Sequence, residues 1–215
     1  MMQILWFLIK AILVLLLPFI VLIRGAVFLH ANYGLLPSIS LIGGVIITAF
    51  LLFIYLSIVY SKFTKKVGNA SSLKGRALLS FLLVAIFTIH GLSFFNTDNL
   101  KSKEVRSEIH DLHPILRLGT STFTFLDKNL VVTDASRIPE DYRKMGLRTP
   151  NNSLHFTQKD GYAYAVDLRT KGRPEFINKA TTLYFRLMGF NTLRHVGTED
   201  HLHISLYCHY HKKAI

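Results

Sequence analysis

The chain has 215 residues, of which half are hydrophobic, and a formal net charge of +12. Its mean hydropathy of +0.34 excludes an ordinary soluble protein and indicates membrane-spanning segments. The charge does not indicate nucleic-acid binding, because five basic residues lie in one short loop and the rest form no stripe interleaved with aromatic side chains.

Three long apolar stretches open the chain, at 4–23, 35–60 and 77–95. Each has about 19 or more residues, enough to cross a hydrocarbon core of about 30 Å as a helix. The alternative for the first stretch is a cleavable signal peptide. Its apolar run exceeds the usual length for such a peptide and no small-residue cleavage site follows, so we expect a retained span.

The basic residues of the loops predict the orientation. The loop 61–76 carries five lysines and arginines and no acid, whereas the first loop has only Arg24 at its edge. We therefore expect the second loop and the amino terminus in the cytoplasm and everything after Phe95 outside. Basic residues mixed with acids in 98–108 favour the reverse, but less strongly. The prediction is a multi-pass protein of the cell (inner) membrane with an extracytoplasmic carboxyl-terminal domain.

The chain divides into a membrane module at 1–96, a charged linker at 97–111 and a polar domain at 112–215. About a hundred residues suffice for a single core. The one cysteine, Cys208, excludes an intrachain disulfide, so core packing or a metal ion must hold the domain together.

Alternating and helical patterns predict an α+β domain with a small antiparallel sheet. We expect strands at 123–126 and 130–133 around a hairpin-like turn, and a short helix at 139–145 between Pro139 and Gly146. A helix is predicted at 175–188, ending at Gly189. Its apolar side chains, which we expect to pack on the sheet, are Phe176, Ala180, Leu183, Tyr184 and Leu187.

Two further strands, at 162–168 and 201–207, carry the polar residues of interest. Alternation puts Asp167 on one face with Ala163 and Ala165. It puts His203 on one face with His201 and Ser205. Both polar faces could therefore line one cleft, although neither a lone aspartate nor a His-x-His pair is specific by itself.

Short motifs around these residues are more specific. Ser153 and His155 match the start, and Ala165 and Asp167 the end, of the pattern S-x-H-x-x-G-x-A-x-D. This pattern is typical of the zinc peptidases that include D-Ala-D-Ala carboxypeptidases, L-alanyl-D-glutamate endopeptidases and the hedgehog-type domain. The segment 132–137 looks like that family's arginine element, and 200–203 looks like its acid and last histidine. The chain resembles this family over about residues 112–207.

The resemblance implies a zinc site and assigns roles to its residues. His155, Asp167 and His203 would be the ligands of Zn²⁺, and Asp200 would be the general base, with the neighbouring Glu199 as the alternative. Arg137 would orient the substrate or stabilise the oxyanion, with Arg148 as the alternative. Such a site suits peptide hydrolysis, since zinc activates water and polarises a carbonyl.

One spacing departs from the family. His155 and Asp167 are twelve residues apart, wider than in the motif, and 156–160 looks like an insertion. The insertion leaves three alternatives: both ligands stay in place, Asp160 replaces Asp167, or the site is degenerate. We favour Asp167, because only this aspartate has the Ala-x-Asp context on a strand.

The expected function is a membrane-anchored zinc peptidase that hydrolyses peptidoglycan stem peptides, as a D,D- or L,D-carboxypeptidase or an endopeptidase. The expected partners are these wall peptides and the lipid bilayer, without nucleic acid, and the oligomeric state is left open. The alternative is a noncatalytic cell-wall-binding or regulatory module. A transporter or channel is disfavoured, because Lys10 and His90 are the only ionisable groups that we find inside the spans.

Overall fold

The computed structural model describes residues 2–146, 148–197 and 200–211, with the backbone alone at 2–4 and 7–15. Three long helices come first: α1 (Met2–Tyr33), α2 (Pro37–Thr64) and α3 (Ala70–Ser93). Short elements follow: η1 (Thr97–Asn99), α4 (Lys103–Glu108), η2 (Ile109–Asp111), α5 (Pro114–Leu126), β1 (Val132–Asp134) and α6 (Pro139–Lys144). The chain continues with β2 (Ala165–Arg169), α7 (Glu175–Met188), β3 (Asn191–His195) and β4 (His201–Ser205).

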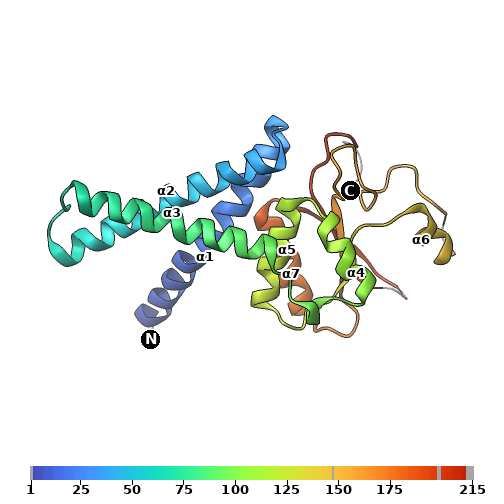
Figure 1. The fold of residues 1–215 in the computed structure, drawn as a ribbon. Coiled ribbons are helices and arrows are strands. Elements are labelled where there is room, and N and C mark those ends of the chain that lie inside the picture. The colour runs from blue at the N-terminus through green and yellow to red at the C-terminus, as the bar shows by residue number, and fades with distance from the viewer. Residues whose placement is uncertain (1, 147, 198–199, 212–215) are drawn as a thin grey trace.

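The helices α1, α2 and α3 are long and apolar enough to cross a membrane, as the sequence predicts. In Figure 1, α2 and α3 form a hairpin that points away from the domain, and α1 crosses them. Glycines permit a close crossing of α1 and α2: a Cβ on Gly44 would lie 2.6 Å from the carbonyl oxygen of Leu22. Small residues at such crossings are typical of helices packed in membranes.

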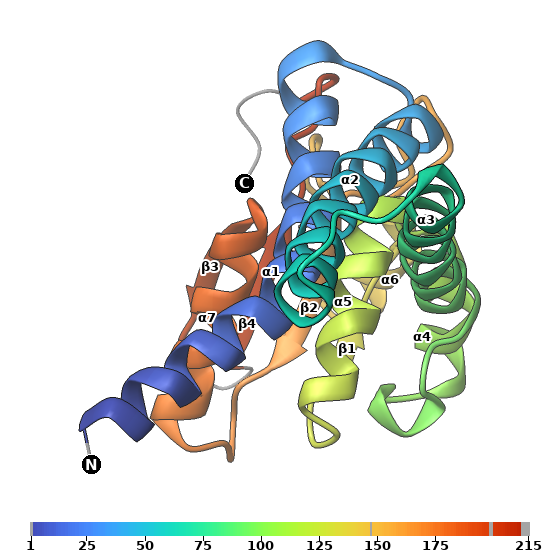
Figure 2. The same cartoon turned by 90° about the vertical axis from the view of Figure 1, so that its left-hand side faces the viewer.

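The domain packs directly on α1 and α3. A Cβ on Gly91 of α3 would lie 2.6 Å from Cδ1 of Leu118 in α5. The guanidinium of Arg24 donates to the carbonyl of Leu187 at 3.1 Å, at the end of α7. Buried residues of α1, such as Ile23, belong to the same hydrophobic core as those of the domain. The helices and the domain therefore form one continuous body, with α1–α3 nearest the viewer in Figure 2.

Residues 97–111, expected to be a linker, contain η1, α4 and η2. Val105 and Ile109 are buried in the common core. This segment is therefore part of the packed domain rather than a linker before it.

The domain is α+β with a four-stranded antiparallel sheet in the order β1-β2-β4-β3. The register pairs Asp167 with His203 and Ala165 with Ser205. On the opposite face of the same strands, Leu168 and Ile204 are buried in the core. The polar faces predicted from strand alternation therefore lie on the same side of the sheet, and the strands that carry them are neighbours.

The strand predicted at 123–126 is wrong, because these residues form the last turn of α5. The run of threonine and phenylalanine favours a strand locally. Packing decides otherwise: Pro114 opens the helix, the Nδ1 of His113 accepts the N–H of Ile115, and Phe123 is buried against Phe185. The edge strand β3 is not foreseen either.

Helix α7 has the predicted bounds but a different buried face. Its buried residues are Asn178, Thr181, Phe185 and Met188, whereas Phe176, Leu183 and Leu187 are exposed. The amide of Asn178 donates to the carbonyl of Thr170 at 3.1 Å and so turns this polar edge inward. The expectation that the apolar stripe of α7 packs on the sheet is therefore wrong for most of its members.

Candidate metal centre

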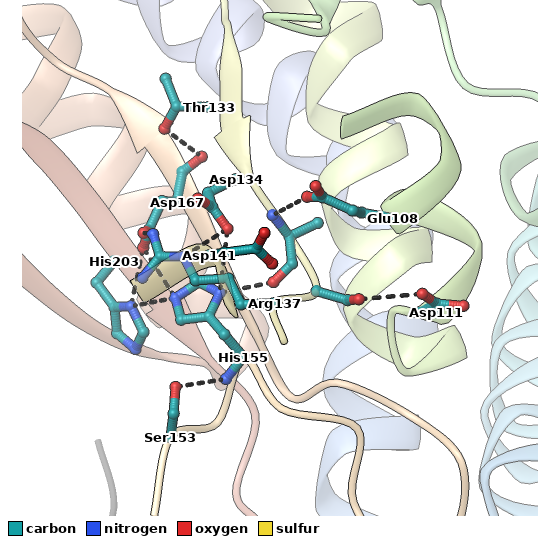
Figure 3. Close-up of polar contacts among 12 residues, drawn as sticks. Glu108, Asp111, Thr133, Asp134, Arg137, Asp141, Ser153, His155, Asp167 and His203 are labelled. Carbon is teal, nitrogen blue, oxygen red and sulfur yellow. Dashed lines mark hydrogen bonds and ion pairs between the residues drawn. The ribbon is translucent and has the colours of Figure 1, made fainter. Parts of the chain in front are cut away.

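Three side chains from separate parts of the domain meet on one face of the sheet. His155 lies in the loop after α6, Asp167 lies in the middle of β2, and His203 lies opposite it on β4 (Figure 3). The Nε2 of His155 is 3.3 Å from Nδ1 of His203 and 3.4 Å from Oδ1 of Asp167. The Nδ1 of His203 is 2.9 Å from the same carboxylate oxygen. All three residues are buried.

This triangle has the dimensions of a small-metal site. Ligand atoms about 2.0–2.1 Å from a tetrahedral Zn²⁺ lie about 3.3–3.4 Å from one another. Two of the three separations have this value and the third is somewhat shorter. The residues present therefore fit a metal ion that accepts two imidazoles and a carboxylate.

The backbone orients His155 for this role. Its Nδ1–H donates to the carbonyl of Ala135 at 2.6 Å, which leaves the lone pair of Nε2 directed at Asp167 and His203. Metal-binding histidines usually donate their second N–H in this way, because the bond fixes the ring and its tautomer. The Nε2 of His203 is buried without a hydrogen-bond partner among the described residues.

The electrostatics of the cluster favour an ionised Asp167. Burial alone would raise the pKa of this carboxyl, but His155 and His203 outweigh it and hold the pKa well below its usual range. Burial would lower the pKa of His155, and the charge of Asp167 reverses this and raises it. The carboxylate thus concentrates negative charge where a cation would bind.

Arg137 holds the second oxygen of Asp167. Its Nη2 donates to Oδ2 of Asp167 at 2.7 Å, and its Nε lies 2.7 Å from Oδ1 of Asp134. Burial would lower the pKa of Arg137, but these two carboxylates raise it instead. In this arrangement the guanidinium positions Asp167, and it also lines the neighbouring cavity. Arg148 is exposed and lies outside the cluster.

The residues proposed as the base differ from the ligands in their surroundings. Asp200 accepts hydrogen bonds from Nε and Nη2 of Arg194, at 3.0 and 2.8 Å, and from Thr170 at 2.5 Å. Arg194 and Thr170 lower the pKa of Asp200 to about 2. A carboxylate so firmly paired accepts a proton weakly at neutral pH. Glu199 lies outside the described residues.

Asp160 forms hydrogen bonds within its own loop and is not part of the cluster. Its Oδ2 accepts the hydroxyl of Tyr164 at 2.5 Å, and its Oδ1 accepts the N–H of Tyr162. The amide of Gln158 closes the same turn by donating to the carbonyls of Ser153 and Phe156. The wider spacing between His155 and Asp167 is thus accommodated by a folded turn that leaves both residues in the triangle.

A cavity of about 730 Å³ lies beside Asp167. Its wall includes Lys101, Arg169 and Lys171, three cations that sequence analysis missed. Strand alternation could have identified Arg169, which lies two residues after Asp167. Nothing local connects Lys101 with the site, since it comes from the segment before α4. Comparison of the chain with protein-family models, curated proteins and solved structures finds no match.

Proposed function

We propose that the protein is a membrane-anchored, zinc-dependent peptidase that acts on acidic wall peptides of the peptidoglycan type. The observation that carries this proposal is the buried triangle of His155, Asp167 and His203, with separations that suit Zn²⁺. The resemblance of the surrounding motifs to zinc D-Ala-D-Ala carboxypeptidases and L-alanyl-D-glutamate endopeptidases supports the reaction class.

Each residue then has a task. Bound in the triangle, zinc supplies Lewis acidity, which makes water nucleophilic at neutral pH and polarises the scissile carbonyl. The carbonyl of Ala135 fixes the ring of His155, and Arg137 holds Asp167 in the orientation that presents Oδ1. The burial of all three ligands limits competing water.

The cavity beside Asp167 suits an anionic substrate. Within the described ranges neither Lys101 nor Arg169 forms an ion pair, so both remain available to a carboxylate that enters this space. Stem peptides of peptidoglycan carry several carboxylates. The basic loop 61–76 supports an extracytoplasmic domain, which is the side on which such peptides occur.

One observation favours a noncatalytic module as the second candidate. The pairing of Asp200 with Arg194 and Thr170 lowers the basicity of the residue that the motif assigns as the general base. If neither Asp200 nor Glu199 accepts a proton, the same centre would bind wall peptides without cutting them.

Zinc content and peptide hydrolysis, measured on the full chain in detergent, test the proposal. We expect one zinc per chain, mass-detected cleavage of purified muropeptides, and loss of both on His155→Ala, Asp167→Ala or His203→Ala. Asp160→Ala is the matched control and should keep the metal. Either Asp200→Ala or Glu199→Ala should keep zinc and reduce turnover roughly 10²-fold. Stoichiometric zinc without any cleavage would favour the binding module, and absence of zinc would remove both.

A further inference from the structure

An apolar groove of about 330 Å³ shares no lining residue with the cavity of the metal centre. Side chains from four helices line it, among them Leu16 and Phe19 of α1, Phe87 of α3, Phe125 of α5, and Leu183 and Leu187 of α7. In Figure 1, α5 and α7 lie between the long helices and the rest of the domain, while α6 lies at the far end. The groove is thus formed jointly by the membrane module and the domain.

The groove continues along an exposed apolar ridge of α7. Phe176, Leu183 and Leu187 are 70%, 58% and 48% exposed, and Phe125 is 53% exposed. The opposite face of α7 is buried through Phe185 and Met188, so rotation of the helix cannot hide the ridge. A contiguous apolar surface of this kind marks a contact with a partner or a membrane.

The position of the groove identifies its occupant. Phe19 lies inside the candidate span Leu16–Tyr33, and Phe87 lies inside the candidate span Ala70–Ser93. Phe87 precedes the end of α3 by six residues, which corresponds to about 9 Å along the helix. The two long helices thus line the groove with residues inside their candidate spans, so the groove lies within the depth occupied by lipid chains.

The charges along α7 agree with an interfacial position. Lys179 and Arg186 are exposed and lie on one edge of the ridge, about one turn from Leu183. Long basic side chains can bury their stems in the apolar layer while their charges reach the headgroups. An apolar ridge with a basic border is the pattern of helices that lie in the plane of a membrane surface.

We propose that α7 lies in the membrane interface and that the groove holds acyl chains of bilayer lipids. The ridge Phe176, Leu183 and Leu187, with Phe125 of α5, then contacts lipid rather than water. The domain is consequently seated on the bilayer through α5 and α7, and the metal centre on the other face of the sheet is turned away from lipid. This inference is independent of the chemistry proposed for that centre.

Fluorescence quenching by brominated lipid tests the proposal in the full chain. The single tryptophan is first removed by Trp6→Phe, and Leu183→Trp or Leu187→Trp is then introduced. Each variant is reconstituted in phosphatidylcholine vesicles with plain or acyl-brominated chains. An indole about 5–10 Å below the surface meets the bromine atoms, so emission should fall by roughly half. Arg143→Trp on α6 is the matched control and should keep its emission.

Two outcomes would overturn the inference. The first is equal emission of Leu183→Trp, Leu187→Trp and Arg143→Trp in both kinds of vesicle. The second is protection from bromine together with concentration-dependent crosslinking of chains through α7, which would assign the groove to a second copy. Both substitutions replace exposed side chains, and near-ultraviolet circular dichroism establishes that the variants fold.

Discussion

Arg137 is the residue whose role differs most between motif and geometry. The motif assigns it to the substrate, whereas its guanidinium contacts Asp134 and Asp167 at 2.7 Å each. Loss of a group that holds a metal ligand lowers the metal affinity, whereas loss of a group that holds the substrate lowers turnover. The two roles can therefore be separated by measuring both quantities on one variant.

We expect Arg137→Gln to weaken zinc binding by about 10–100-fold, the usual cost of losing a partner of a metal ligand. Competition with a chelator measures the affinity of the folded full chain. Arg143→Gln, which removes a paired but exposed arginine of α6, should leave the affinity unchanged. Unaltered zinc affinity in Arg137→Gln with reduced turnover at saturating zinc would return Arg137 to the substrate-binding role.

Glu108 gives the domain a pH-dependent stability. Burial raises the pKa of this carboxyl from 4.5 to about 7, although its Oε2 accepts the N–H of Ala135. The folded state therefore binds a proton more tightly than the unfolded state. Protonation of Glu108 therefore adds to the free energy of unfolding below about pH 4.5, and this stabilisation is lost as the pH rises through about 7.

Glu108→Gln should accordingly raise the thermal midpoint at about pH 8 by more than it does at about pH 5. The amide keeps an acceptor for Ala135 and carries no charge to desolvate. Glu104→Gln on the same helix should give no such gain, because Glu104 is exposed and its bond with Ser102 lowers its pKa. A larger gain at acid pH would contradict the assignment. Midpoints come from circular dichroism of the full chain in detergent.

At the scale of elements, the sequence predicts those features of the fold that depend on strand alternation and helix capping. The bounds of α7 follow from a regular pattern ended by Gly189, and the facing of Asp167 and His203 follows from strand parity. Asp167 and His203 could be anticipated because they lie at the centres of regular strands, whereas His155 lies in a loop and is assigned only from the motif. The pairing of Arg137 with Asp167 could not, since it depends on how a loop residue reaches a distant strand.

The other elements depend on contacts that no local pattern encodes. β3 is an edge strand without buried alternation, so its residues Asn191–His195 resemble a loop. Helix α5 forms because the long helices cover it, as the packing of Leu118 on Gly91 illustrates. The apolar stripe of α7 predicts a face packed on the sheet, but most of its side chains are exposed, and lipid is the neighbour that we propose for them.

The crossing of α1 and α2 gives a prediction at this scale. Gly44→Ala would place a Cβ 2.6 Å from a backbone oxygen of Leu22, so the helices must separate. Gly75→Ala is the matched control in α3, where no atom lies within 4 Å. We expect Gly44→Ala to lower the thermal midpoint in detergent. Gly75→Ala should leave the midpoint unchanged or raise it, since alanine favours a helix by about 0.5–1 kcal/mol over glycine. Equal midpoints would show that the close approach is not needed.

For the whole molecule, the orientation in the membrane decides which substrates the metal centre can meet. The hairpin of α2 and α3 extends away from the domain (Figure 1), and α2 with its 28 residues is about 42 Å long, more than a hydrocarbon core. If α2 and α3 cross a bilayer, their tip at 65–69 and the domain lie on opposite sides of it.

The basic residues near this tip predict that it is cytoplasmic. Alkaline phosphatase, which folds only outside the cytoplasm, should be active when fused after Ile215 and inactive when inserted between Lys66 and Val67. A fluorescent protein that folds only inside should give the inverse pattern at both positions. Exchange of the two patterns would place the metal centre in the cytoplasm, where mature wall does not occur. The wall-peptide proposal would then fail, whereas the metal site and the lipid-filled groove beside α7 would stand, because neither depends on which leaflet the domain meets.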